Sequence, residues 1–232
     1  MITGDSPTPE SILTRLHALA TRVPYELRVL PGGRLAGPVP AEVAELLAAV
    51  GGFTFPPLEF DLLAHPRQGS DHGLPEPRRV VTDDGGGGLT WVDIAPGDGR
   101  WGQVLMQYRE GGLYVQADSL AHWLDRLLTT AEEIADEYGP DEDPSAYADD
   151  FWDGLHPVGP ELPLLPAPAL RAPDTDPVLA ELACRVPDSA LIADLRSAAP
   201  GSRARFDRHL PWYRLVRATE APVFAAVPRE EG

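Results

Sequence analysis

Apolar residues repeat at helical spacing near the start of the chain. The first predicted helix spans residues 8–23, where Thr8 suits the N-cap and Pro9 suits the first helical position. Its apolar stripe consists of Ile12, Leu16, Leu19 and Val23. Pro24 follows directly, and because proline does not continue a helix, we expect the helix to end there.

A second helix is predicted from Pro40 to the pair Gly51-Gly52, after a Gly/Pro-rich connection over residues 31–38. Its apolar stripe consists of Val43, Leu46, Leu47 and Val50. Residues 58–63 then predict a strand, which a polar loop follows.

Extended segments with short connections dominate the middle of the chain. The predicted strands cover residues 79–82, 89–94, 104–108 and 113–117. The turns between them cover residues 83–88, 96–102 and 110–112. Because such short connections join neighbouring antiparallel strands, the pattern predicts an antiparallel meander.

A long helix closes this unit, with Asp118 or Ser119 as its N-cap and Gly139-Pro140 at its end. Its apolar face consists of Leu120, Trp123, Leu124, Leu127, Leu128, Ile134 and Tyr138. Helices before and after a meander predict an α+β domain over residues 1–140, with the helices packed on one face of the antiparallel sheet.

The rest of the chain predicts a linker and a small second unit. Residues 141–173 are first acidic and then, from Pro157 to Pro173, proline-rich, which is typical of a semi-rigid linker or of an ordered arm across the surface. Residues 174–232 predict a helix from Asp176-Pro177, a second helix from Pro187-Asp188 through Leu195, and a hairpin over 212–218 and 222–227. This helix–helix–hairpin extension is too small for a robust core, so we expect it to dock on the first domain.

The charge of the chain is unevenly distributed. The net charge is −17. Residues 1–154 hold 10 arginines and 26 acidic residues, and residues 155–232 hold 9 arginines and 10 acidic residues. An acidic surface repels nucleic acid and anionic membranes, and it speeds encounter with a basic protein. Solubility alone is the other explanation of this charge.

The composition also bears on the source and location of the protein. The chain contains no lysine and is rich in Ala, Gly, Pro and Arg, which indicates a GC-rich bacterial genome such as that of an actinobacterium. No signal-peptide or transmembrane pattern is visible, so we expect a cytoplasmic protein. The single cysteine, Cys184, lies on a predicted apolar helix face, where we expect it to be buried.

Motifs of catalysis are weak in this sequence. Gly97, Gly99 and Gly102 match a G-x-G-x-x-G pattern, but a strand follows them where a dinucleotide site needs a helix, so we predict a hairpin turn. Ser119 near His122 is explained by an N-cap. The histidines show no metal-ligand spacing, and we predict no catalytic residue, cofactor or metal and therefore no enzyme.

The densest feature is an acidic segment near the end of the long helix. Aromatic residues set among carboxylates suit contact with a basic protein, through charge steering and aromatic anchors. The predicted partner-binding residues are Glu133, Asp136, Glu137, Asp141, Glu142, Asp143, Asp149, Asp150, Phe151, Trp152 and Asp153. A solvated helix face and a metal-dependent hydrolase site are the alternatives, although no calcium-loop spacing is present.

Three stretches in one order resemble the SUKH superfamily, which includes the yeast cell-wall-assembly regulator and many bacterial immunity proteins. They are Val39 to Phe53 with its Gly-Gly pair, Thr82 to Asp93 with its Asp-Gly-Gly-Gly run, and Val115 to Leu124 with its Ala-x-Ser pattern. In the second stretch Leu89 and Asp93 are similar to the family's Leu-x-x-Asp, with one more residue between them. Leu120 stands where the family usually has Phe. The likeness covers residues 8–138.

The resemblance implies an α+β fold, no catalytic machinery, and protein binding. Bacterial members often neutralise toxins, so it favours an immunity protein or antitoxin that binds a basic toxin domain through the acidic surface. An intracellular scaffold or regulator of the same family is the alternative, and the identity of the partner separates the two.

Overall fold

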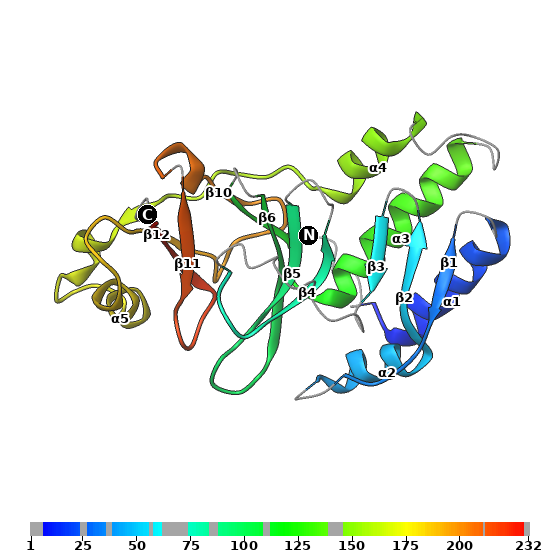
Figure 1. Ribbon diagram of the computed structural model, residues 1–232, viewed down its shortest axis with the longest axis horizontal. Helices are drawn as coiled ribbons and strands as arrows, with labels where there is room; N and C mark the ends of the chain where they lie inside the picture. Colours follow the sequence, from blue (N-terminus) through cyan, green and yellow to red (C-terminus); the bar gives the residue numbers. More distant parts are fainter. Residues whose placement is uncertain are drawn as a thin grey trace.

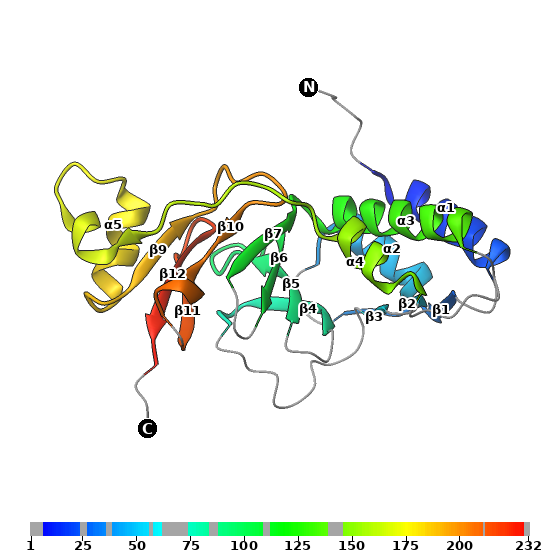
Figure 2. The ribbon, with the colours of Figure 1, turned by 90° about the horizontal axis from the view of Figure 1, so that it is seen from above.

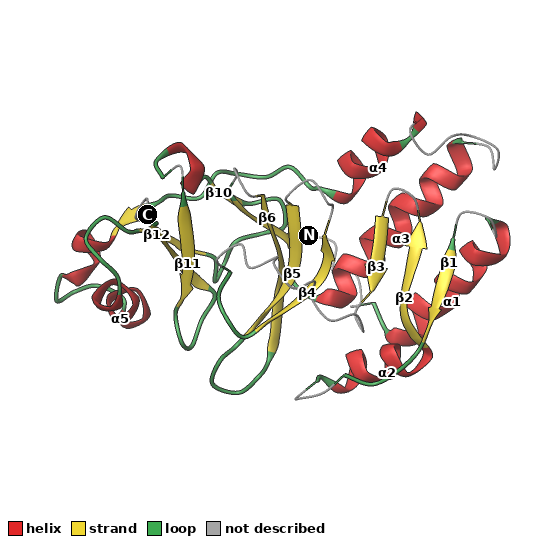
Figure 3. Cartoon of the chain, viewed as in Figure 1, coloured by secondary structure: helices red, strands yellow, loops and turns green. Residues whose placement is uncertain are grey.

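The computed structural model describes residues 7–23, 27–35, 39–55, 58–61, 74–83, 88–108, 112–138, 146–210 and 212–229. Over these residues the chain is an α+β protein with five α-helices and three sheets, whose named strands all pair antiparallel. The sheets follow one another along the long axis of the molecule (Figures 1 and 3).

Helix α1 (Pro9–Arg22) begins where the sequence predicts it. The N-cap Thr8 and Ser11 form a capping box, in which Ser11 N donates to Thr8 Oγ1 at 3.2 Å and Thr8 N donates to Ser11 Oγ at 3.1 Å. Ile12, Leu16 and Leu19 are buried, as the stripe predicts. The capping chemistry therefore fixes the start of the helix, and the stripe fixes the face that packs.

Helix α2 (Ala41–Ala49) passes directly into strand β2 (Val50–Phe55), and the predicted role of Gly51-Gly52 as a helix terminator is wrong. Val50 already has extended backbone angles, and β2 pairs with β1 (Arg28–Pro31) and β3 (Leu58–Asp61). Strands β1 and β2 were not predicted from the sequence. Strand β2 is buried nearly throughout, so its residues do not alternate between buried and exposed. Residues 62 and 63 of the predicted strand lie outside the described residues.

The predicted meander is confirmed. Strands β4 (Arg78–Asp83), β5 (Gly88–Ile94), β6 (Trp101–Tyr108) and β7 (Leu113–Ala117) lie side by side in sequence order. Gly97 and Gly99 lie in the hairpin turn between β5 and β6, as predicted, and Gly102 lies in β6. Gly99 N donates to Ala95 O at 2.9 Å, and Gly99 has φ of 70°. Most of the second glycine run, residues 84–87, lies outside the described residues.

Helix α3 (Leu120–Glu137) has Ser119 as its N-cap. It buries a long apolar face consisting of Leu120, Trp123, Leu124, Leu127, Leu128, Ala131 and Ile134. Figure 2 shows α1, α2, α3 and the later helix α4 (Ala148–Leu155) on the same side of the three-stranded sheet. The first core therefore lies between these helices and the sheets.

Helix α4 lies inside the segment 141–173 that the sequence predicts as a linker, so that prediction is wrong for this part. Tyr147, Phe151 and Leu155 are almost fully buried and belong to the same core as α1 and α3. They recur at four-residue spacing, which gives α4 one apolar stripe among its acids. The linker was predicted from the acidic composition of this segment, which does not register the spacing of its few apolar residues.

The C-terminal unit contains the predicted first helix and hairpin, but not the predicted second helix. Helix α5 (Pro177–Arg185) is capped by Asp176, and β11 (Tyr213–Arg217) pairs with β12 (Val223–Pro228). The predicted second helix is strand β9 (Leu191–Asp194), which lies between β12 and the short β8 (Leu165–Pro166). Short apolar runs do not distinguish a buried strand from a helix.

Cys184 on α5 is exposed, so its predicted burial is wrong. The buried residues of α5 are Leu179, Leu182 and Ala183. Cys184 follows them by one residue, which turns its side chain about 100° away on a helix. Short 3₁₀ segments at Ala167–Arg171 and Phe206–Arg208 complete the unit.

The C-terminal unit is joined to the first domain by a shared strand and a shared core. Strand β10 (Arg203–Ala204) pairs with β7 and thereby extends the five-stranded sheet. Trp91 of β5 meets Phe224 of β12 edge to face, with ring centroids 5.9 Å apart. The second core lies between these two sheets.

A buried ion pair crosses this junction. Arg217 Nε and Nη2 donate to the two carboxylate oxygens of Asp93 at 2.6 and 2.8 Å, and both side chains are at most 4% exposed. Burial raises the pKa of the Asp93 carboxyl, and the guanidinium of Arg217 opposes that rise. Asp93 on β5 and Arg217 on β11 thus join the five-stranded and four-stranded sheets.

Candidate functional site

The structure gathers most of the predicted acidic residues on one surface. Helices α3 and α4 pack against each other (Figure 1). Both helices expose carboxylates. The exposed carboxylates are those of Glu133, Asp136, Glu137, Asp149, Asp150 and Asp153, which together define the acidic face. Asp141, Glu142 and Asp143 lie outside the described residues.

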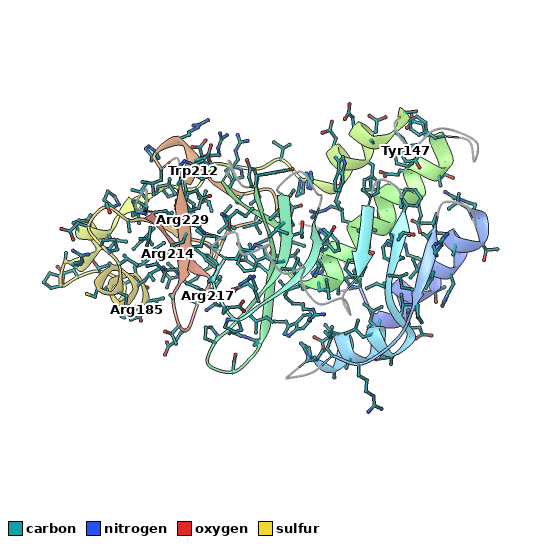
Figure 4. All side chains as sticks on the ribbon, viewed as in Figure 1. Tyr147, Arg185, Trp212, Arg214, Arg217 and Arg229 are labelled. Atoms are coloured by element: carbon teal, nitrogen blue, oxygen red, sulfur yellow. The ribbon has the colours of Figure 1, made fainter. Side chains whose placement is uncertain are left out.

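Aromatic contacts hold the two helices of the acidic face together. Tyr138 at the end of α3 donates a hydrogen bond from its hydroxyl to Asp150 on α4. Its ring lies 5.5 Å from that of Tyr147, which Figure 4 marks beside α4. Because Tyr147 and Phe151 point into the core, the acids of α4 are turned outward. The carboxylates are therefore held on a fixed scaffold.

The predicted role of Phe151 as a partner contact is wrong. Phe151 is 0% exposed, and its ring lies 5.7 Å from that of Phe55 on β2, so it anchors α4 to the core. Trp152 is half-buried and stacks on His156 with ring centroids 5.4 Å apart and an angle of 11°. Trp152 is thus the aromatic residue of the pair that remains at the surface.

Some acids near the face already have cationic partners. Arg15 on α1 binds Glu132 through Nε at 3.0 Å and Nη2 at 2.7 Å, and Arg22 binds Asp136 at 3.0 Å. These pairs join α1 to α3. Glu133, Glu137, Asp149 and Asp153 have no ion pair among the described residues, so their charges are uncompensated by the fold there.

Helix electrostatics distinguishes the two halves of the acidic face. Asp149 and Asp150 lie in the first turn of α4, where the positive end of the helix dipole favours carboxylates. Asp136 and Glu137 lie in the last turn of α3, which contains no basic residue, and there the dipole disfavours them. Glu133 and Glu137 also form a like-charge pair at i and i+4. Folding alone therefore does not explain Glu133 and Glu137.

The described residues contain little else that resembles a chemical site. No group of three or more His, Cys, Asp or Glu side chains among them is arranged to hold a metal ion. Ser119 Oγ lies 3.0 Å from His122 Nδ1 and accepts from His122 N at 3.3 Å, which is the predicted capping role. None of the described helices combines the length and apolar character that a membrane crossing requires.

Sequence reasoning missed a cavity beside the β5–β6 turn. The turn forms one wall, and the start of β4 and the segment before α2 form the others. The glycine pattern was the available signal, but its turn chemistry explained it without reference to a cavity. Lining residues that are far apart in the sequence, such as Leu35 and Trp101, gave no local pattern.

Comparisons of the chain with protein-family models, with curated proteins and with solved structures find no match.

Proposed function

We propose that the chain is a non-catalytic protein-binding protein and that its acidic face binds a basic surface of a partner protein. The observation that carries the proposal is the exposed pair Glu133 and Glu137 near the end of α3, which has no ion pair among the described residues and which helix electrostatics disfavours. Residues that lower stability without a structural role are typical of functional surfaces. A basic partner would relieve this repulsion, and the long-range field would speed its encounter.

Within this proposal, Glu133, Glu137, Asp149 and Asp153 supply the charge, and Trp152 supplies an aromatic contact. The net charge of −16 over residues 1–154 supports a basic rather than an acidic partner. The partner that we favour is a toxin, which makes the chain an immunity protein. This last step rests on the sequence resemblance to the SUKH superfamily, and a scaffold or regulator differs from it by the partner bound.

The proposal is tested by calorimetry, which measures the affinity of the chain for the protein encoded by the adjacent gene at low and at high salt. The test variant is Asp149→Asn/Asp153→Asn, and Glu42→Gln/Glu45→Gln on α2 is the matched control, because both remove two exposed charges. We expect the test variant to weaken binding at least about tenfold and the control to leave it nearly unchanged. Added salt should weaken wild-type binding.

Equal weakening by both double variants would show that only the total charge matters, and the acidic face would then be wrong as a docking site. Absence of binding at low salt would remove the neighbouring product as the partner. If the chain instead binds a different basic protein, and only the α4 variant weakens that binding, the acidic face remains the docking site. The proposed role as an immunity protein would then give way to that of a scaffold or regulator.

A further inference from the structure

We propose that the chain forms a dimer in which a basic patch on the C-terminal unit of each copy binds the acidic face of the other. The basic patch consists of Trp212, Arg214 and Arg229, all of which are exposed. The dimer goes beyond the proposed function, because it requires no other protein. It does not rest on that function either, although both use the acidic face.

The three side chains of the basic patch share one face of the four-stranded sheet. Arg229 N donates to Trp212 O at 3.0 Å, so these residues lie opposite each other, and Arg214 pairs with Val227. Alternate residues of a strand point to the same face, and diagonal neighbours lie about 7–8 Å apart. Val216 and Val227 on this face pack in the cluster that contains α5. The basic patch therefore continues the face that α5 covers and is exposed there.

The fold does not account for the basic patch. Six of the nine arginines in residues 155–232 have ion pairs, whereas Arg214 and Arg229 have none among the described residues. A charge on an edge strand such as β11 deters aggregation, which would explain Arg214 alone. Trp212 opposes that purpose, because it is 45% exposed. Neighbouring Trp and Arg side chains at a surface are typical of the residues that contribute most to protein interfaces.

The basic patch fits an acidic protein surface, and the chain itself provides one. The acidic face carries Glu133, Glu137, Asp149 and Asp153 without ion pairs among the described residues, and Trp152 lies half-buried beside them. Asp149 and Asp153 are four residues apart on α4, which separates them by about 6 Å along the helix. This spacing is close to that of the two arginines in the basic patch. Two arginines therefore meet two carboxylates in one contact.

The positions of the two surfaces bring both contacts into one dimer. In Figure 4 Trp212 and Tyr147, which lies beside α4, are at opposite ends of the molecule and both toward its upper edge. A twofold axis between them brings the basic patch of each copy to the acidic face of the other. Two identical contacts then close the assembly at two copies.

The net charge of the chain opposes this dimer only at long range. Two chains that each carry a net charge of −17 repel each other. At an ionic strength of about 0.15 M, exposed charges more than about 8 Å apart are largely screened, so the charges in direct contact decide. We therefore expect the dimer to be tightest at moderate salt and weaker at both very low and high salt.

Charge reversal on each surface tests the inference. The basic-patch variant is Arg214→Glu/Arg229→Glu, and the acidic-face variant is Asp149→Arg/Asp153→Arg. In sedimentation equilibrium we expect the wild-type chain to show a reversible equilibrium between the 25.0 kDa monomer and a dimer. Each variant alone should dimerise at least about tenfold more weakly, because like charges then meet at both contacts.

A mixture of the two variants gives the sharpest result. In a pair with one copy of each variant, both contacts again join opposite charges, so we expect a heterodimer although neither variant dimerises well alone. Rescue by mixing excludes misfolding as the cause of the loss. Arg34→Glu/Arg100→Glu is the matched control, because it reverses two exposed arginines outside both surfaces, and it should leave dimerisation nearly unchanged.

Several results would overturn the proposal. They are a wild-type chain that stays monomeric at its highest soluble concentration, a mass that rises beyond the dimer, equal weakening by the basic-patch variant and the control, or a mixture without heterodimer. If a charge-reversal variant fails to fold, Trp212→Ala decides instead, since removal of an interface tryptophan should weaken the dimer at least about tenfold. An unchanged dimer in Trp212→Ala would then overturn the proposal. Because no other protein is present, none of these results decides whether the acidic face binds a basic partner.

Discussion

The two ends of the molecule use charge in different ways. In residues 155–232, six of the nine arginines pair with carboxylates, and positive and negative charges nearly balance. In residues 1–154, acidic residues outnumber arginines by 26 to 10, and the surplus includes the acidic face. Figure 4 shows Arg185, Arg214 and Arg229 at the end of the molecule far from Tyr147 and α4.

The helices at the two ends show the same contrast. Helix α5 has Asp176 as its N-cap and Arg185 in its last turn. The helix dipole stabilises both charges, because acids are favoured at the N-terminus of a helix and bases at its C-terminus. Helix α3 ends on acids and has no base in its last turn. The C-terminal unit thus follows the rules of helix stability, and α3 departs from them. Such departures are expected where a surface serves binding rather than folding.

The largest expected effect concerns the ion pair that joins the two regions. Arg217→Ala leaves the carboxylate of Asp93 buried without its partner, and we expect a loss of about 3–5 kcal/mol in the free energy of unfolding. Urea denaturation followed by tryptophan fluorescence measures this loss. Arg214→Ala on the same strand is the control, because Arg214 is exposed, and we expect a change within about 0.5 kcal/mol.

The double variant Asp93→Leu/Arg217→Met sharpens the same test. Replacement of a buried ion pair by apolar residues of similar size is often neutral, so we expect it to recover most of the stability lost in Arg217→Ala. A double variant as unstable as the single one would show that the pair is needed for reasons other than the uncompensated charge.

A comparable effect is expected where α4 meets the core. Phe151→Ala removes a fully buried ring, and we expect a loss of about 3–5 kcal/mol together with detachment of α4. Trp152→Ala removes a half-buried ring and should cost less stability, but it should weaken partner binding. Hydrogen exchange of the α4 amides separates the two variants. Equal protection of α4 in Phe151→Ala and the wild type would contradict the anchoring role.

The sequence allowed prediction of the elements that local rules control. The start of α1 followed from Thr8 and Pro9, and the meander followed from the short connections between extended segments. The errors lie where tertiary contacts override local rules. Residues 191–194 form a strand because β12 pairs with them, and Gly51-Gly52 are extended because β1 pairs with β2.

The candidate site was predictable in its charges but not in its geometry. The density of acids in residues 132–153 was visible in the sequence. Phe151 and Trp152 are adjacent, however, and only the packing against Phe55 shows that the first is buried. The cavity was unpredictable because its walls come from segments more than 60 residues apart, from Leu35 to Trp101.

A smaller and opposite effect is expected from the acids of α3. Glu133→Gln/Glu137→Gln removes a like-charge pair and an unfavourable dipole contact, so we expect stability to rise by up to about 1 kcal/mol at low salt while partner binding weakens. Glu42→Gln/Glu45→Gln is the control, since Glu42 lies in the first turn of α2, and stability should fall slightly. Thermal denaturation at two salt concentrations measures both. A loss of stability in the α3 variant would show that these acids serve the fold.

The smallest expected effect concerns pH and the C-terminal unit. Burial raises the pKa of Asp194, but its hydrogen bonds with Arg196 outweigh burial, and its pKa lies below the ordinary value. The side chain of Arg196 also lowers the pKa of Asp176, helped by the backbone N–H of Leu179. Because these carboxyls bind protons more weakly in the folded chain, they stabilise it above about pH 4, and that contribution is lost as pH falls further.

Arg196→Gln should therefore flatten the decline in the urea midpoint below about pH 4, relative to the wild type. Arg100→Gln is the control, because Arg100 and Asp98 approach only to 3.9 Å and both are well exposed, so the profile should keep its wild-type slope. A slope that Arg196→Gln leaves unchanged would mean that acid sensitivity comes from carboxylates elsewhere. Paired charges would then contribute less to the stability of the C-terminal unit than its ion pairs indicate. The C-terminal unit and the acidic face would differ less in how their charges affect stability.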